Sequence, residues 1–189
     1  IFTTYKLDQA KVDSIIEFDV NPSVELKINK NEKILEAKSL NDDGEAILKG
    51  MDLKNTDIDV AVNAIIGSML KNGYISELQN SILVSVKNDN SVKGKELEAR
   101  ITKEINDLLI SSKIEGAIMT QTLKTDETTD SNISVGKAKL INEIIATNNT
   151  LKFDDLAKMN INELNVLKES QEVKTDKITS SGSASQKAY

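Results

Sequence analysis

The sequence of 189 residues contains neither cysteine nor histidine. Without cysteine the chain can form no disulfide and no thiolate metal site, and without histidine it has no histidine-based catalytic triad and no histidine metal ligand. Tryptophan is also absent and aromatic residues make up only 3% of the chain, so the core must be built from Ile, Leu, Val, Ala and Met. Any catalysis must therefore use other side chains.

Positive charge and long apolar runs are also scarce. The net charge is −6 and the isoelectric point is near 4.9, with no basic stripe, which argues against a nucleic-acid partner. No apolar run approaches the roughly 18 residues that span a bilayer. The chain opens at Ile1 without a methionine and without a recognisable signal peptide, so we expect a fragment or a processed product.

Hydrophobic periodicity predicts an α+β fold. Apolar and polar residues alternate through much of 14–39, which predicts a β-hairpin unit of two or three strands. Helical spacing of apolar residues follows at 56–73 and 95–112, and short apolar runs at 80–87 and 115–124 predict strands. This order predicts a mixed β-sheet with both helices packed on one face.

Composition divides the chain into four parts. We expect an α/β domain over residues 1–124 and a linker over 125–133, of which the first eight residues include none that is apolar. Residues 134–169 show short helical patterns and predict a small helical unit. The polar, serine-rich end at 170–189 is predicted to be a disordered tail.

The only proline, Pro22, directly follows Asn21 in a segment that otherwise alternates like a strand. One interpretation is a bulge or kink between two strand segments, because proline cannot donate to a strand ladder. The other is self-cleavage, in which the Asn21 side-chain amide attacks its own main-chain carbonyl, forms a succinimide and expels Pro22. Proline closes the competing deamidation route because it lacks the backbone N–H that this route needs. A strained local backbone would assist such a cut.

Asp19 and Ser23 flank this pair. In an unbroken strand Asp19 and Asn21 would point to the same face, which would bring the carboxylate within reach of the amide. Ser23 is a candidate for polarising the carbonyl or orienting the amide. Both also have ordinary interpretations, Asp19 on the polar face of a strand and Ser23 in a turn.

A nearby acidic cluster comprises Asp42, Asp43 and Glu45. Its spacing does not match an EF-hand loop, so we interpret it as a solvated turn and expect neither a metal nor a cofactor. A conventional hydrolase built on these acids is disfavoured, because no two of them have a spacing that indicates convergence.

The stretch "EFDVNPSVELKIN", followed by "KILEAKSLNDDGEAILKGMDLKN", resembles the extracytoplasmic region of RsgI-type anti-sigma factors, which are membrane proteins of Gram-positive bacteria. The likeness also includes the "ILVSV" strand and the helical pattern at 133–167, and it covers most of residues 14–168. Such proteins join a cytoplasmic anti-sigma domain, one transmembrane helix, this domain and often an outer module that binds polysaccharide.

The resemblance implies self-cleavage at Asn21–Pro22, once per molecule rather than as a turnover enzyme. The N-terminal strand would then stay bound to the rest of the domain until regulated intramembrane proteolysis frees the sigma-I factor. A sigma factor and membrane proteases are the implied partners, with carbohydrate reached only through a module that this sequence does not contain. The implied location is the extracytoplasmic side of the cell membrane. The alternative is a non-cleaving extracellular interaction or scaffold domain in which Asn-Pro is a strand bulge.

Overall fold

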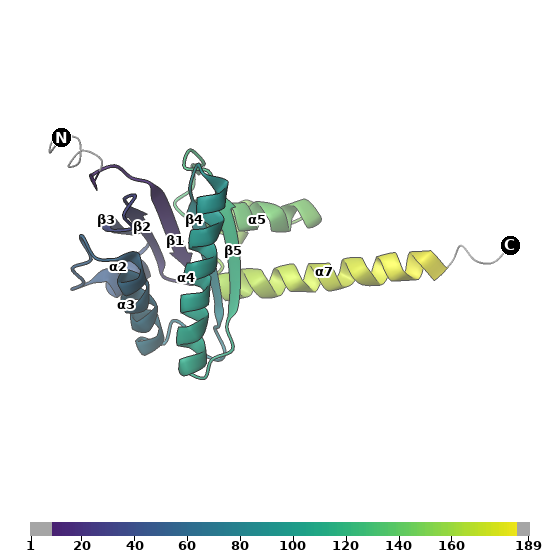
Figure 1. Cartoon of the computed structure of the whole chain (residues 1–189). Helices are drawn as coiled ribbons and strands as arrows, with labels where there is room; N and C mark the ends of the chain where they lie inside the picture. The colour runs from purple at the N-terminus through teal and green to yellow at the C-terminus, as the bar shows by residue number, and fades with distance from the viewer. Residues whose placement is uncertain (1–8, 185–189) are drawn as a thin grey trace.

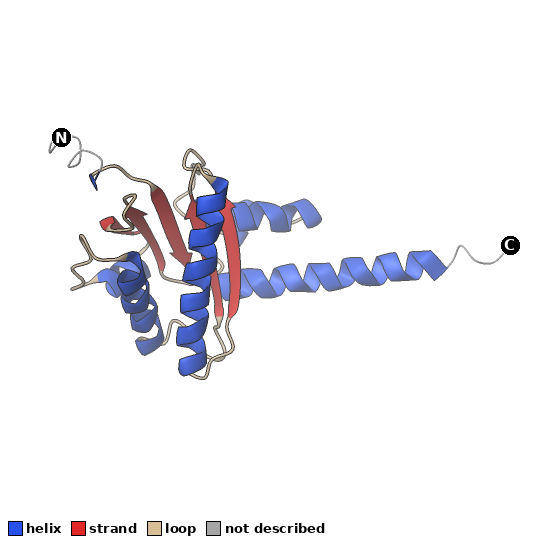
Figure 2. Ribbon diagram, viewed as in Figure 1, coloured by secondary structure: helices blue, strands red, loops and turns tan. Residues whose placement is uncertain are grey.

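A five-stranded sheet forms the centre of the molecule, in the order β3-β2-β1-β4-β5. The computed structural model describes residues 9–184, and their side chains through residue 173. Strands β1, β2 and β3 form antiparallel pairs, β1 also pairs antiparallel with β4, and β4 pairs parallel with β5, so the predicted α+β fold with a mixed sheet is confirmed (Figure 2). The strands are β1 (Ser14–Asp19), β2 (Ser23–Ile28), β3 (Ile34–Ser39), β4 (Ser81–Lys87) and β5 (Ala117–Leu123).

Strand β1 is the central strand and is hydrogen-bonded on both sides, to β2 and to β4. Its apolar residues Ile16 and Phe18 are fully buried on one face of the sheet. Glu17 and Asp19, which alternate with them, are buried as well. The strand that precedes Asn21 is therefore covered on both faces and on both edges.

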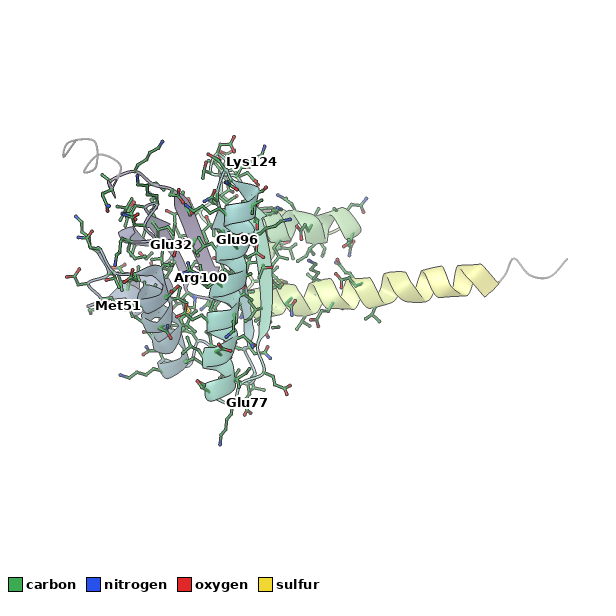
Figure 3. All side chains as sticks on the ribbon, in the orientation of Figure 1. Glu32, Met51, Glu77, Glu96, Arg100 and Lys124 are labelled. Atoms are coloured by element: carbon green, nitrogen blue, oxygen red, sulfur yellow. The ribbon has the colours of Figure 1, made fainter. Side chains whose placement is uncertain are left out.

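Helices α2 (Asp42–Leu48), α3 (Ile58–Lys71) and α4 (Ser91–Ser111) cover the face that carries Ile16 and Phe18 (Figure 1). The two long helices predicted on one face are thus confirmed. Helix α4 begins four residues before the predicted 95, because the Asn90 side chain accepts the backbone N–H groups of the first turn. Figure 3 shows Arg100 of α4 beside Glu32 in the β2–β3 loop, where the guanidinium and the carboxylate lie 2.5 Å apart.

The small helical unit covers part of the opposite face. It comprises α5 (Val135–Thr147), the short α6 (Phe153–Leu156) and the first half of α7 (Ile161–Ala184). Leu83 of β4 is the buried sheet residue of this second core, and the partly buried Met119 of β5 packs against it. The apolar residues of the unit that pack with it are Leu140, Ile141, Ile144, Leu156, Ile161 and Leu164.

Helix α7 continues well beyond the predicted helical unit. The structure is helical through residues 170–184, where a disordered tail was predicted, and residues 185–189 lie outside the described part. Lysine, glutamate and glutamine are frequent at 168–177, where neither proline nor glycine occurs, so local propensity favours a helix over this part of the predicted tail. Figure 1 shows α7 projecting away from the sheet. Among the described residues, no helix combines the length and the apolar character that crossing a membrane requires.

Candidate functional site

Asn21 and Pro22 lie in the tight turn between β1 and β2. Asp19, the last residue of β1, pairs with Ser23, the first of β2, and the Val20 backbone N–H donates to the Pro22 carbonyl at 3.0 Å. Pro22 lies outside the paired residues of the two strands, so its missing N–H leaves no ladder hydrogen bond unmade. The bulge interpretation is therefore wrong, because the strand does not run on through Pro22 but reverses there.

Helix α2 holds the side chain of Asn21. Its amide nitrogen Nδ2 donates to Oδ2 of Asp43 at 2.8 Å, and the other carboxylate oxygen of Asp43 accepts from the Tyr74 hydroxyl at 2.8 Å. The hydrogen bond to Asp43 raises the pKa of the Tyr74 phenol, so Tyr74 remains a proton donor at neutral pH. The Tyr74 hydroxyl thus orients the Asp43 carboxylate toward the Asn21 amide.

Asn41, the N-cap residue of α2, binds the main-chain carbonyl of Asn21. Nδ2 of Asn41 donates to this oxygen at 2.5 Å. Oδ1 of Asn41 accepts from the backbone N–H groups of Ser23, at 3.0 Å, and Gly44, at 2.8 Å. Because both of these partners are donors, the orientation of the Asn41 amide is determined, and its NH₂ group must face Asn21.

Gly44 allows α2 to approach the turn this closely. A Cβ atom at position 44 would lie 2.2 Å from the backbone oxygen of Ser23, a distance that side chains do not reach. Only glycine therefore lets the first turn of α2 lie directly against the start of β2. Asn41 and Asp43 owe their positions beside Asn21 to this contact.

Asp19 and Ser23 bond to each other rather than to the Asn21 side chain. The two carboxylate oxygens of Asp19 accept from the hydroxyls of Ser23 and Ser134, both at 2.6 Å. Strand alternation would have put Asp19 and Asn21 on one face, but β1 ends at Asp19 and the turn leaves Asn21 exposed. The carboxylate that accepts a hydrogen bond from the Asn21 amide is that of Asp43, and not that of Asp19 as expected. The backbone N–H of Ser23 reaches the site indirectly, through Asn41.

Burial raises the pKa of Asp19 from its ordinary value of 3.8 to about 6. The hydrogen bonds from Ser134 and Ser23 and the charge of Lys137 on α5 act in the opposite direction, while the neighbouring charge of Glu17 adds to the increase. Removal from water therefore outweighs the two hydroxyl donors.

This shift predicts a dependence of stability on pH. In the folded protein Asp19 keeps its proton up to about pH 6, whereas the unfolded chain loses it near pH 3.8. Between these values the folded state binds more protons, so stability falls as pH rises through the window, by about 3 kcal/mol in total. We expect urea unfolding of Asn21→Ala protein, kept in one piece, to show this fall relative to an Asn21→Ala/Asp19→Asn variant. Parallel pH profiles for the two proteins would contradict it.

Sequence reasoning missed Asn41, Asp43 and Tyr74. Asp43 was interpreted as part of a solvated turn and, in a disfavoured alternative, as an acid of a conventional hydrolase, although it belongs to a helix whose cap is Asn41. The available signal for a helix start was Asn41 as an N-cap residue followed by acidic residues in the first turn. Tyr74 follows the end of α3 and carried no signal.

The turn thus places the Asn21 amide beside a hydrogen-bond acceptor and the Asn21 main-chain carbonyl beside a hydrogen-bond donor. The Asn21 amide donates to Asp43, and the Asn21 carbonyl accepts from Asn41. Such a set is what an intramolecular attack on a peptide carbonyl requires.

Comparison with known proteins adds an independent observation. Residues 13–143 match the family model described as the anti-sigma factor RsgI-like central domain. The chain is similar to the anti-sigma-I factor RsgI6 of Acetivibrio thermocellus, with 34% identity over 161 residues that make up 79% of this chain and 21% of that protein. It is also 26% identical to the anti-sigma-I factor RsgI of Bacillus subtilis over 117 residues, 61% of this chain and 30% of that protein. The chain therefore spans less than a third of the length of these relatives.

Proposed function

Because this chain belongs to the family of RsgI-like anti-sigma factors, through their central domain, we propose that it is a signal-relay domain that cuts itself at Asn21–Pro22. The cut takes place once per molecule, by cyclisation of Asn21. The two pieces stay together afterwards, and the domain acts as a switch that is cut in advance and released on demand.

The observation that carries this proposal is the pair of hydrogen bonds on Asn21. The amide that must attack donates to Asp43, and the carbonyl that must be attacked accepts from Asn41. A hairpin turn needs neither bond for its geometry, since the strand pairing and the Val20–Pro22 bond already close it.

The reaction balances without water. Nδ2 of Asn21 forms a bond to the main-chain carbonyl carbon of the same residue and loses one proton. The bond from that carbon to the Pro22 nitrogen then breaks, and this nitrogen gains one proton. The products are residues 1–21 ending in a succinimide and residues 22–189 beginning with a free proline.

The position of β1 supports retention of the upstream piece. After the cut, β1 remains hydrogen-bonded to β2 and β4. Ile16, Phe18 and Val20 stay in the main core, where burial of such a side chain is worth about 1.5–3 kcal/mol. A strand held on two edges and two faces can persist as a non-covalent partner of the domain.

The helical unit adds contacts to the same piece. The Gly136 backbone N–H donates to Glu17 at 2.9 Å, and the Ser134 hydroxyl donates to Asp19 at 2.6 Å. The Ile161 N–H, at the start of α7, donates to the Val20 carbonyl at 2.8 Å. Load applied through α7 therefore reaches β1 directly, and local undocking of the unit would loosen the upstream piece.

In the whole protein we place this domain on the extracytoplasmic side of a Gram-positive cell membrane. The upstream piece would be tied to the membrane through its N-terminal end, so a pull from the C-terminal side would extract it. Regulated intramembrane proteolysis would then free the sigma factor. Sigma binding and sensing of carbohydrate belong to other parts of such proteins.

Electrophoresis under native and denaturing conditions tests the proposal. We expect one native species that separates into two pieces in denaturant without any added protease. A chain that remains whole in denaturant would instead support a non-cleaving scaffold domain.

A Gly44→Ala substitution should slow the cut. The new Cβ would meet the Ser23 backbone oxygen at 2.2 Å, so α2 must move away and carry Asn41 and Asp43 with it. A displacement of about 1 Å costs on the order of 10²-fold in rate. The measurement is the cut fraction against time after cell-free synthesis.

Gly67→Ala is the matched control, because it makes the same change within helix α3 where a Cβ would meet nothing within 4 Å. This variant should be cut at the wild-type rate. Equal rates for Gly44→Ala and Gly67→Ala would show that the position of α2 does not matter for cleavage.

A further inference from the structure

We propose that Asp43 is the general base of the cleavage and that Asn41 stabilises the oxyanion, with Tyr74 as a positioning residue for Asp43. This inference rests on the proposed self-cleavage and names the groups that drive it.

The need for a base follows from the nucleophile. A carboxamide nitrogen is weakly nucleophilic because its lone pair is delocalised, and it must lose a proton as it attacks. Asp43 Oδ2 accepts a hydrogen bond from this nitrogen at 2.8 Å, within the range for direct proton transfer. The Tyr74 hydroxyl holds the other oxygen at 2.8 Å, so the carboxylate cannot turn away.

Other nearby acids are less well placed. Both oxygens of Asp19 are occupied by the hydroxyls of Ser23 and Ser134, and its side chain is fully buried. Asp42 lies on the same helical turn as Asp43 but is exposed, whereas Asp43 is half-buried. Of these three acids, Asp43 is the one whose carboxylate accepts a hydrogen bond from the Asn21 amide.

The need for Asn41 follows from the charge that develops on the attacked carbonyl. As Nδ2 of Asn21 adds to the carbon, its oxygen becomes an oxyanion, and a donor already in place stabilises it without reorganisation. Asn41 Nδ2 donates to this oxygen at 2.5 Å in the resting turn. The bonds from Ser23 N–H and Gly44 N–H to the other end of the Asn41 side chain fix the donor in this direction.

The proton that Asp43 takes from Asn21 can be returned to the reaction. The Pro22 nitrogen needs one proton to leave, and the protonated Asp43 can supply it directly or through a water molecule. Asp43 then ends as the carboxylate with which it began. The role is therefore that of a proton shuttle across the two halves of one reaction.

An Asp43→Asn variant tests the base. It keeps an oxygen that can accept from Asn21 but removes basicity, so the cut should slow on the order of 10²–10⁴-fold. Asp42→Asn, the matched control, removes the same charge from the same turn and should be cut at the wild-type rate. Cell-free synthesis sampled into denaturant at intervals gives the rates, and thermal melting shows whether both variants are folded.

Added formate provides a readout that a purely structural role would not move. In Asp43→Ala protein, formate should accelerate the cut, whereas sodium chloride at the same concentration should not, because a small carboxylate can replace the missing base at this exposed turn.

Asn41→Asp keeps the oxygen that caps α2 but loses the donor, and should slow the cut about 10²–10³-fold.

The outcomes separate the two proposals. Wild-type protein that is never cut would overturn self-cleavage, and the role of Asp43 with it. Wild-type protein that is cut while Asp43→Asn is cut equally fast would overturn the role of Asp43 alone. Slow Asp43 variants that formate does not accelerate would also overturn that role, and cutting of Asn41→Asp at the wild-type rate would overturn the role of Asn41.

Discussion

An Asn21→Ala chain should remain in one piece indefinitely, whereas the wild-type chain separates into two pieces in denaturant. Alanine has no amide to attack the carbonyl, so the loss of cleavage should be complete rather than partial. The fold should survive, because Asn21 is exposed and its side chain contributes only surface hydrogen bonds. A surface change of this kind alters the free energy of unfolding by less than about 1 kcal/mol. Denaturing electrophoresis and thermal melting measure the two effects.

The matched control is Asn31→Ala, which removes an exposed asparagine from the neighbouring β2–β3 turn. It should be cut like the wild type. If Asn21→Ala protein still separated into pieces near residue 21, a contaminating protease would explain the cut and cyclisation would be refuted.

A Lys87→Met substitution should produce the largest loss of stability. The Lys87 ammonium and the Glu17 carboxylate lie 2.8 Å apart, and their side chains are only 6% and 1% exposed. Methionine fills similar space but leaves Glu17 as a buried charge without its cation, supported mainly by the Gly136 N–H. Breaking such a pair costs about 3–5 kcal/mol. Urea unfolding in an Asn21→Ala background measures it on an uncut chain.

The same change should also speed the loss of the cut piece. Glu17 belongs to residues 1–21 and Lys87 to residues 22–189, so their ion pair joins the two pieces across the cut. In wild-type background, Lys87→Met should release the upstream piece during gel filtration while wild-type protein keeps it.

Lys93→Met is the control for this release, because Lys93 pairs with Asp13 of the same piece at a more exposed site. It should change the free energy of unfolding by no more than about 1 kcal/mol. Equal effects of the two substitutions would show that burial of the Glu17–Lys87 pair is not what matters.

Local sequence patterns predicted the strands and the two long helices well. Alternation of Ile16, Phe18, Val24 and Leu26 follows directly from which face of the sheet meets the helices. The same alternation misled us at Pro22, because Val20 continues the apolar pattern beyond the point where β1 ends. A hairpin turn of only three residues hardly interrupts the alternation of apolar and polar residues. For this reason we predicted a bulge at Pro22 and expected the Asp19 carboxylate to reach the Asn21 amide, and both predictions were wrong.

Contacts between distant segments were beyond local reasoning. Asn41 and Asp43 meet Asn21 across 20 and 22 residues of sequence, and Tyr74 joins them from the end of α3. Docking of the helical unit depends on Gly136, where a Cβ would lie 1.9 Å from the Ser85 hydroxyl oxygen. Such a contact cannot be read from sequence spacing, since it depends on how two elements are packed.

The mass of the purified wild-type protein, taken in acid immediately after denaturation, is the measurement to make first. Self-cleavage by cyclisation predicts two species, residues 1–21 lighter by one water than the free acid, and residues 22–189 beginning with proline, whose masses add up to that of the intact chain. A single species with the mass of all 189 residues, unchanged after days of incubation, would contradict self-cleavage and leave Asn21–Pro22 as an ordinary hairpin turn.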